Sequence, residues 1–391
     1  MNTDLSLASW MPLQQQRLLR VLCVDQNDAG AAFVAWNQDA DWEGHFDRGS
    51  FRLLPTVYKH IEALSIDDPA MGRLRGLYRR SWVRNQRYLS TWSNLYDELK
   101  SKGINVLLLG GSALAAGYYR NVGARYVTGS DLLVRPFQAA DTFAAMRSAG
   151  WRFEAHEIEL LDDRRYVSFL DPLGEPGTLR WHPISSWNEE SLDWFWDSAI
   201  PARVDNFSMS VPGPTAMFLY LMAEMREQEA WTIAVLLADV NTIIQHSNFD
   251  WHQLLREART HQLMWTLGLT IGCLQTTFGV SIPTQVLQQL SSTSSTFCER
   301  LELRLYRERQ RDQESFLSPV VAVLARYLRF VRGRTVGEIL ARSPEFLRRY
   351  YGSKHLLQIV MRLLGNGVRR AARLLARRFH RVPQPMTGAG N

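Results

Sequence analysis

The chain has 391 residues, of which 46% are hydrophobic and 21% are charged, an ordinary balance for a globular protein. No N-terminal stretch has the pattern of a signal peptide, and no run reaches the roughly 18 apolar residues of a membrane-spanning helix. Cys23, Cys273 and Cys298 lie far apart, which argues against a disulfide framework or a zinc cluster and favours a reducing cytoplasm.

The net charge of +6 conceals an asymmetry along the chain. From Arg326 onward there are 15 Lys and Arg residues and two acids, so this region carries +13 and the remainder carries −7. Such a basic region indicates an anionic partner without naming it.

The first hundred residues have the apolar spacing of helices from about residue 13 to residue 100. The clearest helix covers residues 71–100, in which large apolar side chains recur every three or four residues. It is expected to end at Gly103.

A different pattern begins at residue 104. Residues 104–109 are a short apolar run before Gly110-Gly111-Ser112, which predicts a buried strand, a turn and then a helix over 113–119. The next elements are a strand over 127–134 and a helix over 136–149. Further strands are expected over residues 151–160, 165–170, 177–184 and 204–211.

From residue 214 the pattern is helical again, with helices expected over 215–229, 231–245, 250–262, 264–278 and 283–290. A Ser/Thr-rich linker follows at 291–296, helices resume to about residue 375, and 382–391 has the composition of a disordered tail. This order predicts an α+β fold, in which a small mixed-sheet core is flanked by helical N- and C-terminal regions. The expected domains are residues 1–100, 101–212, 213–325 and 326–391.

The turn Gly110-Gly111-Ser112 has the chemistry of a phosphate cradle. Glycines let the backbone bend tightly and approach a ligand closely. The first N–H groups of the following helix lack internal partners and attract anions, and Ser112 could cap that helix and donate to a phosphate. An ordinary strand-to-helix turn with a serine cap is the alternative interpretation.

Asp131 stands at the head of the apolar strand, directly after Ser130. A buried carboxylate must be paired or bound to a metal. Asp131 is therefore a candidate ligand-binding residue.

The order of these motifs resembles the uncharacterised nucleotidyltransferase family within the polymerase-β-like nucleotidyltransferase superfamily. The resemblance covers about residues 100–290 and, more weakly, the helical N-terminus. It is carried by Gly110-Gly111-Ser112, Arg125, Asp131-Leu132-Leu133-Val134, Ala149-Gly150-Trp151, Trp181-His182-Pro183, Trp231, Asp239 and Asp250-Trp251. It implies a nucleotidyltransferase-like core at 101–212 that binds a nucleoside triphosphate with Mg²⁺ on Asp131. The implied nucleotide-binding residues are Gly110, Gly111, Ser112, Arg125 and Ser130, and the implied catalytic positions are Asp131, Arg180 and His182.

The carboxylate set that the resemblance implies is incomplete. The family has Asp-x-Asp on this strand, because residues i and i+2 point to one face, and a third acid two residues before a histidine. Here Gly129 takes the first position, Asp131 the second, and Arg180 the third. One carboxylate can share a phosphate-bound Mg²⁺, but two-metal chemistry is difficult to support with it.

These substitutions lead to the hypothesis that Arg180 lies beside Asp131 and replaces the metal as its counter-charge. Alternatively, acids nearby in sequence could rebuild the site. The candidates are Glu154, Asp162, Asp163 and Asp171, of which the last three are more simply explained by turns.

Other residues have two interpretations each. His182 could be a catalytic base or a hydrogen-bonded core histidine, and Arg125 could contact a triphosphate or pair with an acid. Asp239 is better explained by capping or pairing among the helices than by a substrate role, and Asp141 by an exposed helix position.

Residues 352–383 form a basic amphipathic pattern that is broken near residues 365–367. Such a helix could bind an anionic membrane surface, RNA or an acidic protein, or could pack on the body with its arginines in water. No motif supports a specific nucleic-acid partner. The expected location is the cytoplasm, with peripheral membrane association left open.

Two functions follow from the sequence. The first is transfer of a nucleoside monophosphate from a nucleoside triphosphate to an unknown acceptor, either a small molecule or a peptide or protein. The second is a catalytically silent relative that binds a ligand or a partner. The resemblance supports the first, and the incomplete carboxylate set supports the second.

Overall fold

The structure is a computed structural model of the chain. It describes residues 7–119, 121–153, 166–183, 193–205, 207–225, 232–246, 248–293 and 299–301, with short pieces between 323 and 347. The chain divides into two compact units, one made of Met1–Leu161 with Arg165–Arg300, and the other of Leu301–Asn391 with Asp162–Arg164. The candidate site lies within the first unit, which covers nearly all of the first two expected domains and the third up to Arg300; the boundaries between the expected domains stay a prediction.

The N-terminal region is helical, as its apolar spacing predicts. A short 3-10 turn, η2 (Leu7–Trp10), precedes α1 (Leu13–Cys23), α2 (Gln26–Gln38), α3 (Arg48–Ala63) and α4 (Met71–Ser101). The long helix α4 buries Leu74, Tyr88, Trp92, Leu95 and Leu99. From Ser81 to Leu99 the buried positions recur every three or four residues, so one face of α4 points to the interior.

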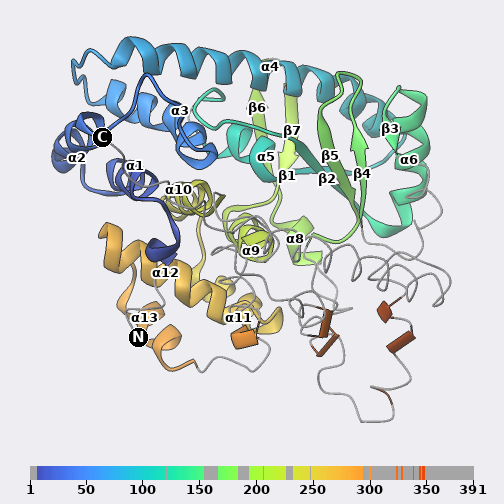
Figure 1. Cartoon of the computed structure of the whole chain (residues 1–391). Coiled ribbons are helices and arrows are strands. Elements are labelled where there is room, and N and C mark those ends of the chain that lie inside the picture. Colours follow the sequence, from blue (N-terminus) through green and yellow to red (C-terminus); the bar gives the residue numbers. More distant parts are fainter. Residues whose placement is uncertain are drawn as a thin grey trace, which may run out of the picture. The chain divides into compact units, whose positions relative to one another are not determined.

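The sheet has five strands in the order β1-β2-β5-β4-β3 (Figure 1). Its strands are β1 (Val106–Leu109), β2 (Ser130–Val134), β3 (Arg152–Phe153), β4 (Tyr166–Leu170) and β5 (Pro176–Arg180). β2 runs parallel to β5 and antiparallel to β1, so the sheet is mixed as predicted. The helices between these strands are α5 (Gly110–Gly117), η3 (Pro136–Gln138) and α6 (Ala139–Ser148).

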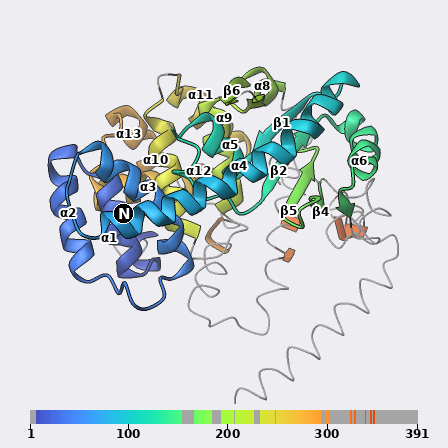
Figure 2. The ribbon, with the colours of Figure 1, turned by 90° about the horizontal axis from the view of Figure 1, so that it is seen from above.

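Helix α4 lies along one face of this sheet (Figure 1, Figure 2). Its residues Trp92, Leu95 and Leu99 face Val106 and Leu108 of β1 across a narrow apolar space. Leu132 of β2 faces the same space. Because strand side chains alternate between faces, Leu107 of β1 and Asp131 of β2 point to the opposite face of the sheet. The candidate site lies on that opposite face.

The segment after the sheet differs from the expectation. One strand was expected over 204–211, and the structure has a hairpin of β6 (Ile200–Val204) and β7 (Phe207–Val211), preceded by α8 (Asp193–Asp197). Pro201 concealed β6, because proline lowers the strand tendency of its run. Asp205, with φ of +50°, makes the turn that joins the two strands.

Five helices follow, close to the predicted positions. They are α9 (Pro214–Met225), α10 (Ile233–Ile244), α11 (Trp251–Thr260), α12 (Met264–Phe278) and α13 (Thr284–Ser291). No helix within the described ranges has the length and apolar character needed to cross a bilayer. The expected basic helix at 352–383 and the tail at 382–391 lie outside the described residues.

Helix α3 begins at a side-chain cap. Asp47 Oδ1 accepts the backbone N–H groups of Gly49 and Ser50 at 2.9 and 3.0 Å, and Gln15 donates to the same oxygen. Burial alone would raise the pKa of Asp47, but the hydrogen bonds from Ser50, Gln15 and Gly49 hold it below its usual value. The charged form of Asp47 therefore stabilises the start of α3.

We expect Asp47→Ala to lower the free energy of unfolding at pH 7 by about 1 kcal/mol, the usual cost of losing such a cap. Because the folded pKa is depressed, this difference persists above the unfolded value of roughly 3.9 and shrinks as the pH falls through the lower folded value. Urea unfolding from pH 3 to 7 measures it. Asp67→Ala, at an exposed carboxylate, is the control, and an equal loss in both variants would contradict the cap.

Candidate functional site

The turn between β1 and α5 is shaped by Gly110. This residue has φ of +61°, a left-handed conformation that glycine adopts without cost. A Cβ built on Gly110 would lie 2.9 Å from Oδ2 of Asp131. The absence of a side chain therefore lets the Asp131 carboxylate lie directly against the start of α5, where backbone N–H groups favour anions.

The two serines of the site bind each other. Ser112 and Ser130 are both buried, and their hydroxyl oxygens lie 2.9 Å apart. The Ser112 hydroxyl also reaches the Gly129 carbonyl at 3.1 Å. The expected capping role of Ser112 is wrong, because α5 begins after Leu109 without a side-chain cap. The serine pair instead fastens the glycine turn to the start of β2.

Asp131 accepts two hydrogen bonds. In the register of β2 with β5 it lies opposite Thr178, whose hydroxyl donates to Oδ1 at 2.5 Å. The hydroxyl of Tyr220 on α9 donates to Oδ2 at 3.3 Å. Asp131 is half-buried, so these bonds orient a carboxylate that still reaches solvent.

Arg180 lies on the same face of the sheet as Asp131. Its Nε donates to the Thr178 hydroxyl at 3.1 Å, and its Nη1 lies 3.1 Å from Oε1 of Glu224. Both side chains of this ion pair are close to 90% buried, with 10% and 12% exposed. Burial alone would lower the pKa of Arg180, but Glu224, followed by Tyr220 and Asp131, raises it.

The structure places Arg180 near Asp131 but gives it a different ion-pair partner from the one in the hypothesis. Arg180 is near enough to Asp131 for that carboxylate to raise its pKa. Its ion-pair partner, however, is Glu224, and the hydrogen-bonded path from Arg180 to Asp131 passes through Thr178. If β5 paired with β2 one residue out of this register, the side chain of Arg180 would point to the face of the sheet that α4 covers.

Gly129 stands where the resemblance implies the first aspartate, and the backbone around it is crowded. A Cβ built on Gly129 would lie 2.8 Å from the carbonyl oxygen of Pro176. Real Cβ atoms essentially never approach an atom so closely. The close approach of β2 and β5 at this point is thus compatible with glycine and not with a larger side chain.

Arg125 is held by an acid rather than left facing a ligand. Its Nε and Nη2 donate to the two oxygens of Asp239 on α10 at 2.7 and 2.8 Å, with 12% and 2% of the two side chains exposed. Tyr119 donates to the same carboxylate at 2.8 Å. Burial would lower the pKa of Arg125, but Asp239 raises it. Asp239 does form a pair, but its partners Tyr119 and Arg125 lie in the segment between α5 and β2, whereas the prediction placed the pairing among the helices.

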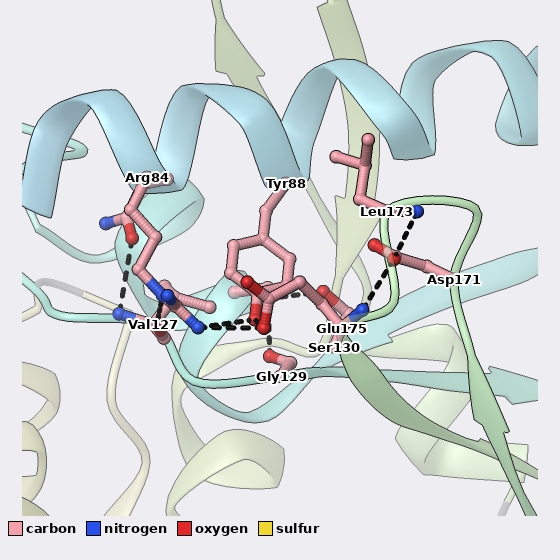
Figure 3. A network of polar contacts seen from close by, with 10 residues as sticks. Arg84, Tyr88, Val127, Gly129, Ser130, Asp171, Leu173 and Glu175 are labelled. Carbon is pink, nitrogen blue, oxygen red and sulfur yellow. Dashed lines mark hydrogen bonds and ion pairs between the residues drawn. The ribbon is translucent and has the colours of Figure 1, made fainter.

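The remaining candidates lie apart from this arrangement. Asp171 is buried and accepts the backbone N–H groups of Leu173 and Glu175, both at 2.8 Å, so it belongs to its turn as predicted (Figure 3). Asp141 is exposed on α6, and His182 follows the end of β5 by two residues and is half-buried. Glu154, Asp162 and Asp163 lie outside the described residues.

Three residues of the site were not predicted: Thr178, Tyr220 and Glu224. The last two are four residues apart on α9, so they share one face of that helix. Glu224 is the single charged residue in this otherwise mainly apolar helix, which is the signal that could have identified it. Thr178 lies opposite Asp131 because of the register between β5 and β2, and the sequence alone does not specify that register.

The residues of the site would suit at most one Mg²⁺ ion, bound by one carboxylate and by the oxygens of a phosphate. Among the described residues, no group of three or more His, Cys, Asp or Glu side chains is placed to hold a metal. Mg²⁺ keeps several waters and takes one or two carboxylates together with substrate phosphates. Asp131 could supply that carboxylate beside the Gly110 turn.

The family model described as "Uncharacterised nucleotidyltransferase" matches residues 50–279. Because the match covers more than half of the 391 residues, the chain belongs to this family. A comparison with curated proteins gives no match. The family segment starts within α3, in the helical N-terminal region that the resemblance covered more weakly. The helices α3 and α4 are therefore part of the family's architecture.

The two glycines of the turn provide a matched test of the geometry. We expect Gly110→Ala to lower the free energy of unfolding by about 1–2 kcal/mol, because its φ is positive and the new Cβ would meet Asp131. Gly111→Ala should be neutral or stabilising, since its Cβ would lie 3.9 Å from Arg125 in ordinary contact. Urea unfolding of both variants decides, and equal costs would contradict the assigned conformation.

A second prediction concerns the buried ion pair. Asp239→Leu leaves the Arg125 charge buried without its partner, and we expect a loss of about 3–5 kcal/mol of unfolding free energy. The double variant Arg125→Met/Asp239→Leu should lose less than Asp239→Leu alone, because no uncompensated charge remains. Chemical denaturation of the three proteins measures the coupling. A double variant that loses as much as the single one would contradict it.

Proposed function

We propose that this chain binds a nucleoside triphosphate at the Gly110–Gly111 turn, with Asp131 sharing a phosphate-bound Mg²⁺, as a family member in which nucleotidyl transfer is weak or lost. The observation that carries the proposal is the position of the Asp131 carboxylate against the start of α5. A carboxylate beside free backbone N–H groups suits a ligand that brings both phosphates and a cation. The family membership supports the same ligand class.

Two features support loss of transfer. Transfer forms a bond between an acceptor oxygen and the α-phosphorus of the nucleotide, and breaks the bond to the pyrophosphate leaving group. This chemistry is normally supported by two metal ions held by several carboxylates. Here the position of Gly129 is crowded by Pro176, and Arg180 is committed to Glu224.

In this arrangement the guanidinium of Arg180 adds fixed positive charge close to Asp131. Thr178 links the two side chains, and Tyr166 and Tyr220 present their rings to the guanidinium with centroids at 5.3 and 5.9 Å. A charge held this firmly can attract phosphate oxygens without reorganisation. The Mg²⁺ ion, when bound, would neutralise further phosphate charge.

An active transferase is the second candidate, and one observation favours it. Glu224 brings another carboxylate to the same face as Asp131, and both carboxylates raise the pKa of Tyr220, which burial raises most. Glu224 thus stands in the neighbourhood from which the family's missing acid would act. The acceptor would then be a small molecule, a peptide or a protein.

We expect the full chain to melt a few degrees higher with a nucleoside triphosphate and Mg²⁺ than with either alone, because a ligand that binds only the folded state raises its stability. Asp131→Asn should lose the Mg²⁺-dependent part of this shift. Asp141→Asn makes the same chemical change at an exposed helix position and should keep it. Absence of any nucleotide shift in the parent, or its retention in Asp131→Asn, would contradict the proposal.

Release of pyrophosphate, measured in the same samples, separates the two candidates. Release by the parent well above that of Asp131→Asn establishes the transferase. Because transfer needs an acceptor, the assay is repeated with a cell extract that supplies candidate acceptors, and binding without release there as well favours the silent relative.

A further inference from the structure

Two carboxylates surround one guanidinium at the proposed nucleotide site. Asp131 of β2 and Arg180 of β5 share one face of the sheet, because of the register between these strands. Glu224 reaches the same guanidinium from α9. Arg180 therefore has an acid on either side, and its contacts show which of the two it takes.

Arg180 directs its two terminal amino groups at Glu224. Nη1 lies 3.1 Å from Oε1, and Nη2 donates to Oε2 at 3.4 Å. A guanidinium and a carboxylate that meet through two parallel contacts have a defined mutual orientation. Glu224 thus sets the direction in which the Arg180 guanidinium points.

The contact of Arg180 with Asp131 is indirect. Arg180 Nε donates to the hydroxyl of Thr178 at 3.1 Å, and that hydroxyl donates onward to Asp131 Oδ1 at 2.5 Å. A single hydroxyl group therefore separates the guanidinium from the second carboxylate. A direct ion pair between Arg180 and Asp131 would have to replace this hydroxyl.

Among the described residues, the hydrogen bonds to Asp131 come from neutral groups. The hydroxyl of Thr178 donates to Oδ1, and the hydroxyl of Tyr220 donates to Oδ2 at 3.3 Å. A neutral donor orients a carboxylate and leaves its negative charge in place, whereas a paired guanidinium would offset that charge. Asp131 is half-buried, so its charge is within reach of a cation from solvent.

Helix α9 fixes the position of Glu224. Every other residue of this helix is buried, and Glu224 has 12% of its side chain exposed. One turn earlier, Tyr220 donates to Asp131, and its ring centroid lies 5.9 Å from the Arg180 guanidinium. The same helix therefore positions the partner of Arg180 and a donor to Asp131.

The electrostatic effects on Arg180 agree with these contacts. Burial alone would lower the pKa of Arg180, and Glu224 raises it more than Asp131 does. A buried guanidinium that loses its partner is strongly destabilising. Without the charge of Glu224, Asp131 is the other carboxylate to which Arg180 can turn.

We propose that Glu224 is a positioning residue for the metal, which holds both terminal amino groups of Arg180 and thereby leaves the Asp131 carboxylate available to Mg²⁺. In this role Glu224 acts through Arg180 and contacts neither the metal nor the nucleotide. The consequence for Mg²⁺ rests on the proposed function. The choice of Arg180 between the two acids is a property of the folded chain and needs no ligand.

This choice is measured first, by urea unfolding of the full chain without ligand. Asp131→Asn, Arg180→Met and the double variant give the coupling between the two side chains, and the same set is repeated in Glu224→Gln. We expect the coupling, expressed as a factor in the folding equilibrium constant, to rise about tenfold in Glu224→Gln, because Arg180 then pairs with Asp131. Equal coupling in the two backgrounds overturns the proposal.

The consequence for the metal is the ratio of nucleotide affinities with and without Mg²⁺, measured by calorimetry with ATP, GTP, CTP and UTP in turn. We expect Glu224→Gln to reduce this ratio about tenfold, since Arg180 then competes with Mg²⁺ for Asp131. A purely structural Glu224 would change both affinities alike. Glu43→Gln breaks an exposed ion pair with Arg73 by the same chemical change, and it should keep the ratio of the parent.

The variant Arg180→Met/Glu224→Met tests the route through Arg180. It leaves no buried charge alone, so it should fold even where Glu224→Gln does not. No guanidinium competes for Asp131 in this variant, and we expect the Mg²⁺ ratio to return close to that of the parent, although the nucleotide binds more weakly. A ratio that stays low would show that Glu224 contacts the metal itself and overturns the proposal.

An unchanged ratio in Glu224→Gln overturns the proposal as well. A parent that binds none of the four nucleotides contradicts the proposed function instead. The coupling measurement then still decides whether Glu224 holds Arg180 away from Asp131, so the two proposals fail on different results.

Discussion

The buried ion pair between Arg125 and Asp239 holds the segment on which the site depends. It fixes the chain between α5 and β2 to helix α10 through two hydrogen bonds, at 2.7 and 2.8 Å. From the opposite side, Asn85 of α4 donates to the Arg125 carbonyl and accepts the Val127 N–H. This segment leads directly into β2, so the position of Asp131 is set by contacts several residues before it. A buried pair of this kind contributes mainly through the cost of breaking it.

Much of the fold was predictable, because apolar spacing reports which elements bury a face. Helices such as α3, α4 and α11 show an apolar repeat of three and four residues, α9 and α10 are long apolar runs, and β1 and β2 are short ones. The hairpin was not fully predicted, since Pro201 disguises β6 and only the pairing with β7 makes it a strand. The spacing of apolar residues along the chain therefore identifies most helices and strands. Strands such as β6, which form only through pairing with another strand, are not visible in it.

The site was predictable in its residues and less so in its contacts. The resemblance suggested that Arg180 lies beside Asp131, and the register of β2 with β5 places the two residues on one face of the sheet. It could not supply Glu224, which is 44 positions from Arg180 on a helix whose docking depends on the whole first unit. Nor could it show that the hydroxyls of Ser112 and Ser130 bind each other. In each case the missing information was the partner, because partners from distant segments leave no periodic signal.

Fixed guanidinium charge is the feature that distinguishes the proposed nucleotide site. A metal ion supplies positive charge only when it is bound, and its affinity falls as carboxylates are lost from the site. Arginine supplies positive charge permanently, with planar geometry that matches phosphate oxygens. In this chain Arg180 lies on the same face of the sheet as Asp131 and is held there by its buried ion pair with Glu224. Glu224 thus fixes the position of the guanidinium before any ligand arrives. In the proposed nucleotide complex, the anchored charge of Arg180 is the physical reason that the affinity does not depend on Mg²⁺ alone.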